Sequence, residues 1–253
     1  MAGFDAAAPT FDRYRALPQS VAEAIRAAIW SAVGAPAGAR VLDLGAGTGR
    51  IGKAFVAAGD NYVGADHSFS MLREFVLPGR TPRLTQAEGE RLPFREGTFQ
   101  AVLLIQVLTG ASGVRRLLAE AGRVLAPGGA LVVGHTAAPP NGVDEQMKHR
   151  LAEILIGMGV EQHPHRRGHV DALESLALRA RRFSHVVAAS WISERSPNGF
   201  LTRHRTGSRF TALPETVRDN AMQQLASWAE PHFGSLDAAF SESYSFELEV
   251  FEL

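Results

Sequence analysis

The stretch that most constrains the fold of this chain covers residues 41–50. It begins with an apolar segment typical of a buried parallel strand and continues with glycine at every second position, Gly45, Gly47 and Gly49. Beyond the glycines, apolar residues recur at helical spacing as far as Gly59. A strand, a glycine turn and a helix in this order predict the first unit of a doubly wound α/β sheet, where a ligand approaches the backbone at the carboxyl end of the strand.

The spacing of these glycines differs from the dinucleotide fingerprint, which has glycines at offsets of zero, two and five. Arg50 occupies the third offset, and the third glycine comes one residue earlier. In addition, Asp43 places a carboxylate in an otherwise apolar strand. A buried charge requires a partner, and the cationic amine of a ligand would supply one. The turn therefore favours a ligand other than NAD.

This turn resembles the first motif of the class I S-adenosylmethionine (SAM)-dependent methyltransferases, hydrophobic-Asp/Glu-x-Gly-x-Gly-x-Gly, and in particular their small-molecule type 11, ubiquinone-biosynthesis-like branch. The resemblance implies a Rossmann-like doubly wound α/β sheet of seven strands, mostly parallel with the last strand antiparallel. It also implies SAM as the cofactor and S-adenosylhomocysteine as its product. The positions that contact the cofactor in this motif correspond to Asp43, Gly45, Ala46 and Gly47.

A second predicted strand, residues 61–66, also ends in a carboxylate. Asp66 lies about 20 residues beyond the glycines, where an acidic group accepts hydrogen bonds from ribose hydroxyls. NAD-binding folds carry an acid at this position as well, so Asp66 does not distinguish a SAM site from an NAD site. By the resemblance, His67 and Met71 lie along the adenine, although helical spacing makes Met71 an equally good core residue.

The segment that does separate the two ligands is residues 87–94, Ala-Glu-Gly-Glu-Arg-Leu-Pro-Phe. It resembles the family's Gly-Asp-Ala-Glu-x-Leu-Pro-Phe, in which an acidic side chain accepts from the adenine amino group and the next backbone N–H meets a ring nitrogen. Glu88 and Gly89 fall on those two positions, with Glu in place of Asp and Gly in place of Ala. Dehydrogenases have no such element at this spacing.

Two further positions complete the predicted site. Gln106 follows an apolar strand over residues 99–105, at the end where cofactor and acceptor would meet. Residues 123–129, Arg-Val-Leu-Ala-Pro-Gly-Gly, resemble another family motif that precedes the fifth strand. His135 lies just past that strand and has a pKa range suited to a general base, with a histidine that only caps the strand end as the alternative.

We therefore predict a single methyltransferase domain over residues 1–253, with a SAM-binding core over residues 38–136. Period-two and β-branched patterns predict the remaining strands near residues 183–191 and 243–252. The remaining segments, mostly helical, are expected to form a cap or lid, and they comprise residues 1–34, 139–180 and 196–235.

The predicted cap suggests how the acceptor is enclosed. A leading segment with a Tyr and an Arg folds over the cofactor in the family, and Tyr14 and Arg15 match it, with a permanently docked arm as the alternative. The apolar faces of the cap helices carry Met147, Leu151, Met158 and Trp228, which are expected to surround a largely nonpolar compound, while part of this surface docks the cap on the sheet.

Composition limits the partners. The chain has 26 basic and 26 acidic residues, no cysteine and no apolar run near the roughly 20 residues that span a bilayer. We therefore expect a small-molecule acceptor, no nucleic acid, no membrane and a cytoplasmic location without a signal peptide. The histidines of residues 163–169 lack the helical register of zinc motifs, so no metal is predicted. The oligomeric state is left open.

These features together predict an enzyme that transfers a methyl group from SAM to a small molecule by direct displacement. Such a reaction needs alignment of the nucleophile and exclusion of water more than a catalytic motif, because the cofactor carries the difficult chemistry. Two alternatives stay open. One is a SAM-binding sensor or interaction protein without transfer activity, and the other is an NAD-binding Rossmann oxidoreductase.

Overall fold

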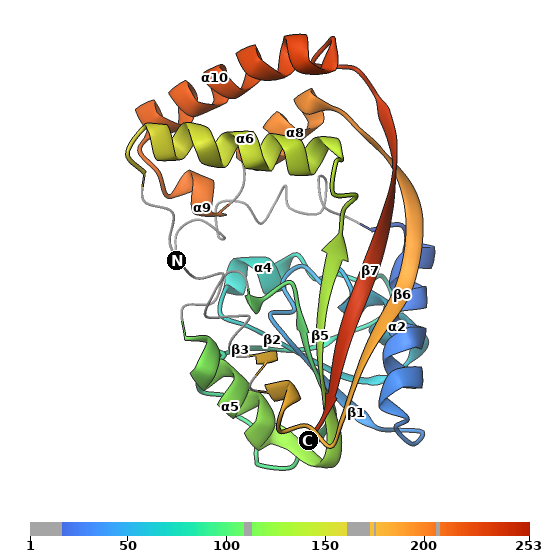
Figure 1. Cartoon of the computed structure of the whole chain (residues 1–253). Helices are drawn as coiled ribbons and strands as arrows, with labels where there is room; N and C mark the ends of the chain where they lie inside the picture. The colour runs from blue at the N-terminus through green and yellow to red at the C-terminus, as the bar shows by residue number, and fades with distance from the viewer. Residues whose placement is uncertain (1–16, 109–112, 161–172, 175, 206–207) are drawn as a thin grey trace. The chain divides into compact units, whose positions relative to one another are not determined.

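A computed structural model of the chain describes residues 17–108, 113–160, 173–174, 176–205 and 208–253. Its strands form one seven-stranded sheet in the order β3-β2-β1-β4-β5-β7-β6 (Figure 1). The elements are α2 (Gln19–Val33), β1 (Arg40–Leu44), α3 (Gly52–Ala58), β2 (Asn61–Asp66), α4 (Phe69–Arg73), β3 (Arg83–Gln86), β4 (Phe99–Ile105), α5 (Val114–Val124), β5 (Leu125–Ala137), α6 (Val143–Gly157), β6 (Arg182–Arg195), α8 (Pro197–Arg205), α9 (Ser208–Thr211), α10 (Glu215–Phe233) and β7 (Phe240–Glu252).

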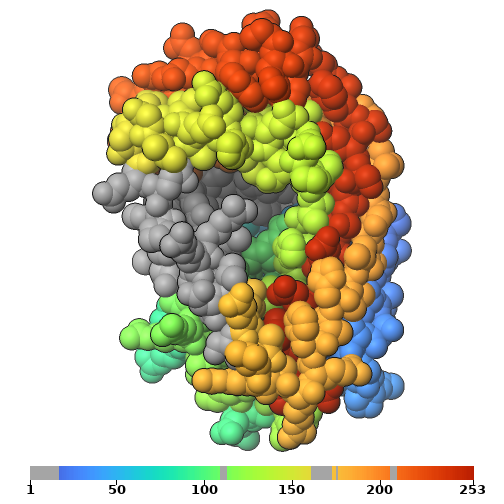
Figure 2. All heavy atoms as spheres, in the orientation of Figure 1, coloured from blue at the N-terminus to red at the C-terminus, as the bar shows by residue number. Residues whose placement is uncertain are grey.

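The sheet is mostly parallel, as predicted. Strands β1 to β5 pair in parallel, whereas β7 runs antiparallel between β5 and β6 (Figure 1). This order differs from the dinucleotide-binding order 3-2-1-4-5-6, because β7 is inserted before β6. The predicted Rossmann-like fold with an antiparallel last strand is therefore confirmed. Both final strands are longer than predicted, and β6 forms the outer edge of the sheet with its atoms at the surface in Figure 2.

The chain divides into two compact units. The described residues of the first, which we call the core unit, fall within 15–136, 164–189 and 246–253. Those of the second, the helical unit, fall within 137–163 and 190–245. No helix in the described part of the chain is both long and apolar enough to cross a bilayer.

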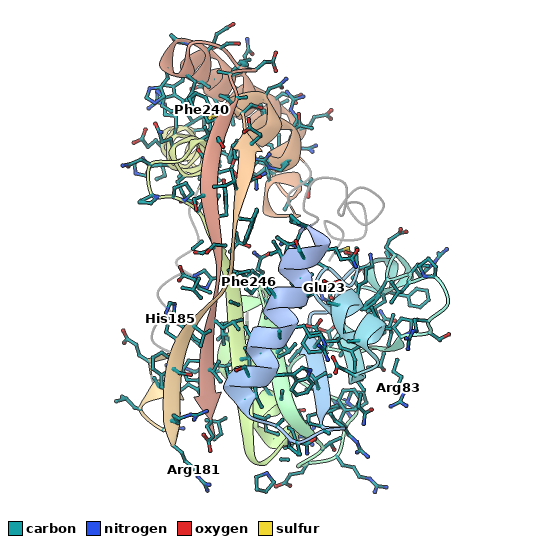
Figure 3. The ribbon with its side chains drawn as sticks, turned by 90° about the vertical axis from the view of Figure 1, so that its right-hand side faces the viewer. Glu23, Arg83, Arg181, His185, Phe240 and Phe246 are labelled. Carbon is teal, nitrogen blue, oxygen red and sulfur yellow. The ribbon has the colours of Figure 1, made fainter. Side chains whose placement is uncertain are left out.

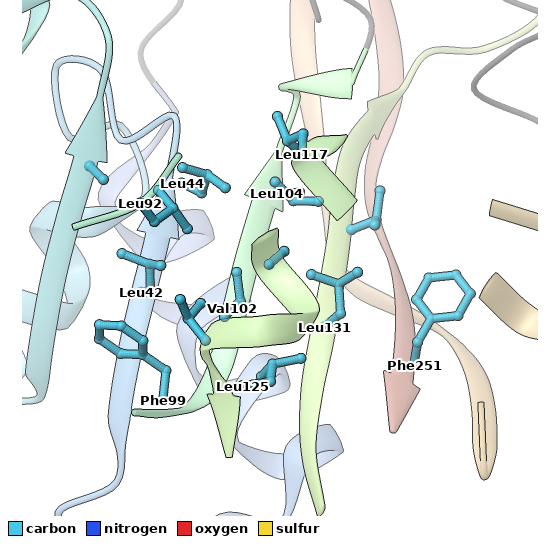
Figure 4. Close-up of a cluster of buried hydrophobic side chains, with 14 of the residues drawn as sticks. Leu42, Leu44, Leu92, Phe99, Val102, Leu104, Leu117, Leu125, Leu131 and Phe251 are labelled. Carbon is cyan, nitrogen blue, oxygen red and sulfur yellow. The ribbon is translucent and has the colours of Figure 1, made fainter. Parts of the chain in front are cut away.

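One face of the core unit's sheet packs against α5. Alternate residues along each strand point to this face, and Leu42, Val102 and Leu131 contribute buried side chains from three neighbouring strands (Figure 4). Leu117 of α5 and Phe251 of β7 belong to the same buried cluster. Because the burial of apolar side chains is the main favourable term in folding, this layer is a main source of the core unit's stability.

The helix α2 lies along the other face of the sheet, as Figure 3 shows. Its residues Ile25 and Ile29 are fully buried, and the helix packs against α3. The structure thus differs from the prediction that residues 1–34 belong to a cap, because the apolar face of α2 covers the core unit. Residues 1–16 lie outside the described part.

The helical unit has a core of its own. Met147 and Leu151 of α6 are buried in one cluster with Phe200 of α8 and with Met222 and Leu225 of α10. The prediction that Met147 and Leu151 line an acceptor pocket is therefore wrong, because these side chains are used to pack the three helices together.

Candidate functional site

The glycine turn after β1 is held against the end of β2. The backbone N–H groups of Gly45 and Ala46 both donate to the carbonyl oxygen of Ala65, at 2.7 and 3.1 Å. Gly45 adopts a left-handed backbone, with φ of 88°, and a Cβ atom at this position would overlap the side chain of Val107. Glycine is required there because the backbone is left-handed and the side chain of Val107 packs directly against it.

The carboxylate of Asp66 connects this turn to the next element. Its Oδ2 accepts the backbone N–H of Gly47 at 2.9 Å, and its Oδ1 accepts that of Ser68 at 2.8 Å. The residue is only 8% exposed, and its side chain is fixed by both bonds. Asp66 thus lies at the end of β2 beside the glycine turn, where the sequence places a group for ribose hydroxyls.

Glycine is required at position 49 for a structural reason that can be tested. Its φ is 81°, and a Cβ atom would lie 2.6 Å from ring atoms of Phe75. Gly34, the C-cap of α2, is also left-handed, with φ of 62°, but a Cβ atom there meets nothing within 4 Å. Gly34→Ala is therefore expected to lower the free energy of unfolding by about 1 kcal/mol from backbone strain alone.

Gly49→Ala should add the cost of the collision, about 1–3 kcal/mol beyond the effect of Gly34→Ala. Urea unfolding of the two variants and the unsubstituted chain measures the difference. Equal losses in both variants would contradict a role of Gly49 in close packing.

The buried acid of β1 has a partner that the sequence analysis missed. Asp43 is 3% exposed, and its Oδ2 accepts the hydroxyl of Tyr62 on β2 at 2.8 Å. Burial raises the pKa of Asp43 to about 6, the hydrogen bond from Tyr62 opposes that rise, and the charge of Asp66 adds to it. Burial also raises the pKa of Tyr62 well above its ordinary value, so that its hydroxyl remains a donor. Asp43 is therefore mostly ionised at pH 7, and a nearby cation would stabilise its buried charge.

The residues predicted to meet the adenine converge on the same edge. His67 follows Asp66 directly, and its Nδ1 lies 3.3 Å from Asp66 Oδ1. Ala87 donates its N–H to the carbonyl oxygen of Asp66 at 3.0 Å, which brings the exposed Glu88 beside the end of β2. Met71 is buried, at 4% exposure, and so fills the core role that the sequence left open beside the adenine contact.

An ion pair on α5 holds the loop of residues 88–94. Arg123 donates to the carbonyl oxygens of Phe94 and Leu92, at 2.9 and 3.2 Å, and pairs with Glu120 at 2.8 Å. Glu120 in turn accepts the N–H of Leu92, and its pKa is lowered to about 2, chiefly by the Arg123 hydrogen bond. The motif that begins at Arg123 is thus physically linked to the predicted adenine loop.

Gln106 lies at the end of β4 with an unusual backbone. Its φ of 57° lies in the left-handed region, which residues other than glycine rarely adopt. The side chain accepts from Arg50 Nη1 at 2.6 Å and donates to Thr136 Oγ1 at 3.0 Å. Gln106 therefore joins the glycine turn to the end of β5. Sequence reasoning missed Arg50 and Thr136 as its partners, although Arg50 occupies the offset of the third fingerprint glycine.

His135 belongs to β5, and its side chain is about half exposed. Its Nε2 lies 3.8 Å from Oε2 of Glu247 on β7, and Nε2 of His185 on β6 lies 3.1 Å from the same oxygen. The role of His135 as a base stays a prediction. Tyr14 and Arg15 lie outside the described residues, as do residues 161–172 with their three histidines.

The geometry of this edge fits an adenosine-type cofactor with a cationic amine. The glycine turn lies at the carboxyl edge of the sheet, a fixed carboxylate stands beside it at Asp66, and a buried acid lies at Asp43. In the described part of the chain, no group of three or more acidic or histidine side chains could hold a metal ion.

Comparison with known proteins finds similarity to methyltransferases in this region. Residues 42–133 match the model of the family described as a methyltransferase domain. The chain is 36% identical over 142 residues to a demethylmenaquinone methyltransferase of Renibacterium salmoninarum, covering 55% of this chain and 59% of that protein. It is 40% identical over 117 residues to a protein of the same name from Beutenbergia cavernae, covering 46% and 48%. The chain thus spans less than two thirds of the length of these relatives.

Solved structures share the fold over nearly the whole chain. A structure titled as a putative methyltransferase from an antibiotic biosynthesis pathway of Anabaena variabilis has a TM-score of 0.60 at 15% identity, covering 90% of this chain and 96% of that one. A putative type II methyltransferase from Anaeromyxobacter dehalogenans has a TM-score of 0.57 at 19% identity, covering 94% and 97%. At these identities the comparison establishes the architecture alone.

Proposed function

We propose that the protein transfers a methyl group from SAM to a small-molecule acceptor, starting from the match of residues 42–133 to the model of a methyltransferase domain. The observation that carries the proposal is the position of Asp66. Its carboxylate is fixed by Gly47 and Ser68 at the point where the glycine turn meets the end of β2. A carboxylate in that place accepts hydrogen bonds from the two hydroxyls of a ribose.

The other predicted site residues would each contact a different part of the cofactor. Asp43 would balance the cationic amine, the backbone of Gly45 to Gly47 would lie along the amino-acid part, and Glu88 with Gly89 would meet the adenine. When bound, SAM supplies an electrophilic methyl group on a sulfonium, which leaves as a neutral thioether. The chain itself has to orient the acceptor and keep water out. Gln106 and His135, at the ends of β4 and β5, are the proposed groups nearest to that reaction.

Calorimetric titration with S-adenosylhomocysteine and with NAD tests the proposed cofactor. We expect S-adenosylhomocysteine to bind at one site per chain, because the strand order and residues 87–94 differ from those of dinucleotide-binding proteins. We expect NAD to bind more weakly or not at all. Tighter binding of NAD than of S-adenosylhomocysteine would contradict the proposal.

A transfer assay separates the enzyme from a SAM-binding sensor. The relatives are named for demethylmenaquinone, which supports a small molecule as acceptor here as well. Tritiated SAM should label a small-molecule extract, and Asp66→Ala should abolish the labelling. Cofactor binding without transfer to any fraction would favour the sensor, and Asp66-dependent labelling of bulk RNA or protein would contradict the small-molecule acceptor.

A further inference from the structure

The core unit contains a cavity away from the glycine turn. It is a groove of about 840 Å³ at the amino ends of the parallel strands. Its lining includes the first residues of four strands, Arg40 of β1, Asn61 of β2, Arg83 of β3 and Phe99 of β4. In a parallel sheet the amino and carboxyl ends lie at opposite edges, so this groove is distinct from the proposed cofactor site. Its volume lies within the range of small-molecule sites, about 300–1,000 Å³.

The groove is more basic than the rest of the chain. Its lining holds three arginines, Arg26, Arg40 and Arg83, against one acid, Asp60. Arg26 donates to both carboxylate oxygens of Asp60, with Nη2 at 2.7 Å from Oδ1, and so neutralises it. Among the described residues, no carboxylate lies within 4 Å of Arg40 or Arg83. Two positive charges therefore remain in the groove of a chain whose formal net charge is zero.

The sheet register brings these two arginines to one place. Arg40 lies opposite Asn61, and Arg83 lies opposite Val63 on the other side of β2. Neighbouring strands are about 4.8 Å apart and each residue advances about 3.3 Å along a strand, so two strand spacings and an offset of two residues separate the two Cα atoms by about 12 Å. Arg83 Nη1 already reaches across to Asn61 Oδ1 at 2.8 Å, which directs its guanidinium toward the start of β2. An anion above the start of β2 lies within reach of both guanidinium groups.

The rest of the lining is apolar and partly aromatic. Trp30 of α2 and Phe94 are both partly exposed in the groove, together with Pro36 and neighbouring alanines. Aromatic rings and arginine guanidinium groups are the side chains that hold planar ligands with an anionic end. The lining thus combines cationic groups, which suit an anion, with apolar and aromatic surface, which suits a ring.

We propose that this groove is a binding site for an aromatic phosphate monoester, with its phosphate between Arg40 and Arg83 and its ring on the side of Trp30 and Phe94. The dianionic phosphate balances the two positive charges of Arg40 and Arg83, which Asp60 does not neutralise. The aromatic part distinguishes this ligand from inorganic phosphate. The site does not depend on the proposed methyl transfer, because it uses none of the residues of the glycine turn.

Phenyl phosphate is the probe, titrated calorimetrically into the full chain. We expect saturable binding that is tighter than the binding of inorganic phosphate. The double variant Arg40→Ala/Arg83→Ala should weaken it roughly tenfold to a hundredfold, because hydrogen bonds to charged groups are lost. The matched control is Arg115→Ala/Arg181→Ala, which removes two exposed arginines that do not line the groove and should leave the affinity unchanged.

Nuclear magnetic resonance locates the ligand. The ¹⁵N-labelled chain has three tryptophan indole signals, and Trp30→Phe identifies the one that should shift on addition of phenyl phosphate. Several outcomes overturn the proposal: no binding, equal losses in the two double variants, no preference over inorganic phosphate, or a ligand-insensitive Trp30 signal. Displacement of phenyl phosphate by S-adenosylhomocysteine overturns it as well, because the ligand would then lie at the opposite edge.

Discussion

Asp43→Asn is expected to weaken the binding of S-adenosylhomocysteine by a factor of roughly 10–100 at pH 7.5, because the loss of a hydrogen bond to a charged group costs about 1.5–3 kcal/mol. The carboxylate lies on β1 two residues before the glycine turn, and its position suits a cationic amine. Calorimetry on the variant and the unsubstituted chain measures the ratio of dissociation constants. An unchanged constant would remove Asp43 from the site.

The same substitution should stabilise the protein without ligand. The pKa of Asp43 in the folded chain is about 6, above the ordinary value near 3.9 for the unfolded chain. Ionised Asp43 therefore disfavours folding. This cost is absent below about pH 4, grows between pH 4 and pH 6, and stays constant above. Asn accepts the Tyr62 hydroxyl without a charge, so the free energy of unfolding at pH 7 should rise by roughly 1–3 kcal/mol.

Urea unfolding at pH 4 and pH 7 tests this effect, with the gain confined to the higher pH. A variant that is less stable than the unsubstituted chain at pH 7 would show that Asp43 is structural. The affinity of the unsubstituted chain for S-adenosylhomocysteine should also fall about tenfold from pH 7 to pH 5, because only about a tenth of Asp43 is ionised one unit below its pKa. Asp43→Asn should lack that part of the pH dependence.

Asp66→Ala is the second change with a large expected effect. It removes the acceptor for the ribose hydroxyls and leaves the N–H groups of Gly47 and Ser68 without their carboxylate. We expect S-adenosylhomocysteine to bind roughly 10–100 times more weakly, and the free energy of unfolding to fall by about 1–3 kcal/mol. Calorimetry and urea unfolding measure the two effects separately.

Two matched variants make this result specific. Asp66→Asn keeps an oxygen acceptor and should retain part of the affinity. Asp219→Ala removes an exposed aspartate of α10 and should change neither quantity. If Asp66→Ala lowers stability but leaves the dissociation constant unchanged, Asp66 only holds the glycine turn.

Most of the features that the sequence predicted correctly are set by residues close to one another in the chain. The turn after β1 needs glycine because the backbone is left-handed at Gly45 and Gly49, and a local pattern can show that. The strands β1 and β4 could be predicted because strands buried on both faces are continuously apolar. The placement of Asp66 at the glycine turn followed from strand direction, because parallel strands end at the same edge of a sheet.

The wrong predictions concern helices whose apolar face could pack against more than one other surface. The amphipathic patterns of α2 and α6 show that one face is buried, but they do not show what covers it. In the structure α2 covers the sheet of the core unit, and Met147 of α6 packs within the helical unit. Hydrophobic burial is non-directional, so a periodic pattern alone cannot choose between these surfaces.

The sequence by itself determined the strands β1, β2, β4 and β5, the glycine turn, and the two acids near the ends of their strands. Only the tertiary structure decided that Tyr62 is the partner of Asp43, that Gln106 joins Arg50 to Thr136, and that Arg40 and Arg83 face one groove. Each of these contacts joins residues on different elements. Their distances depend on strand register and on the packing of helices against the sheet, which are fixed only when the whole chain buries its apolar surface.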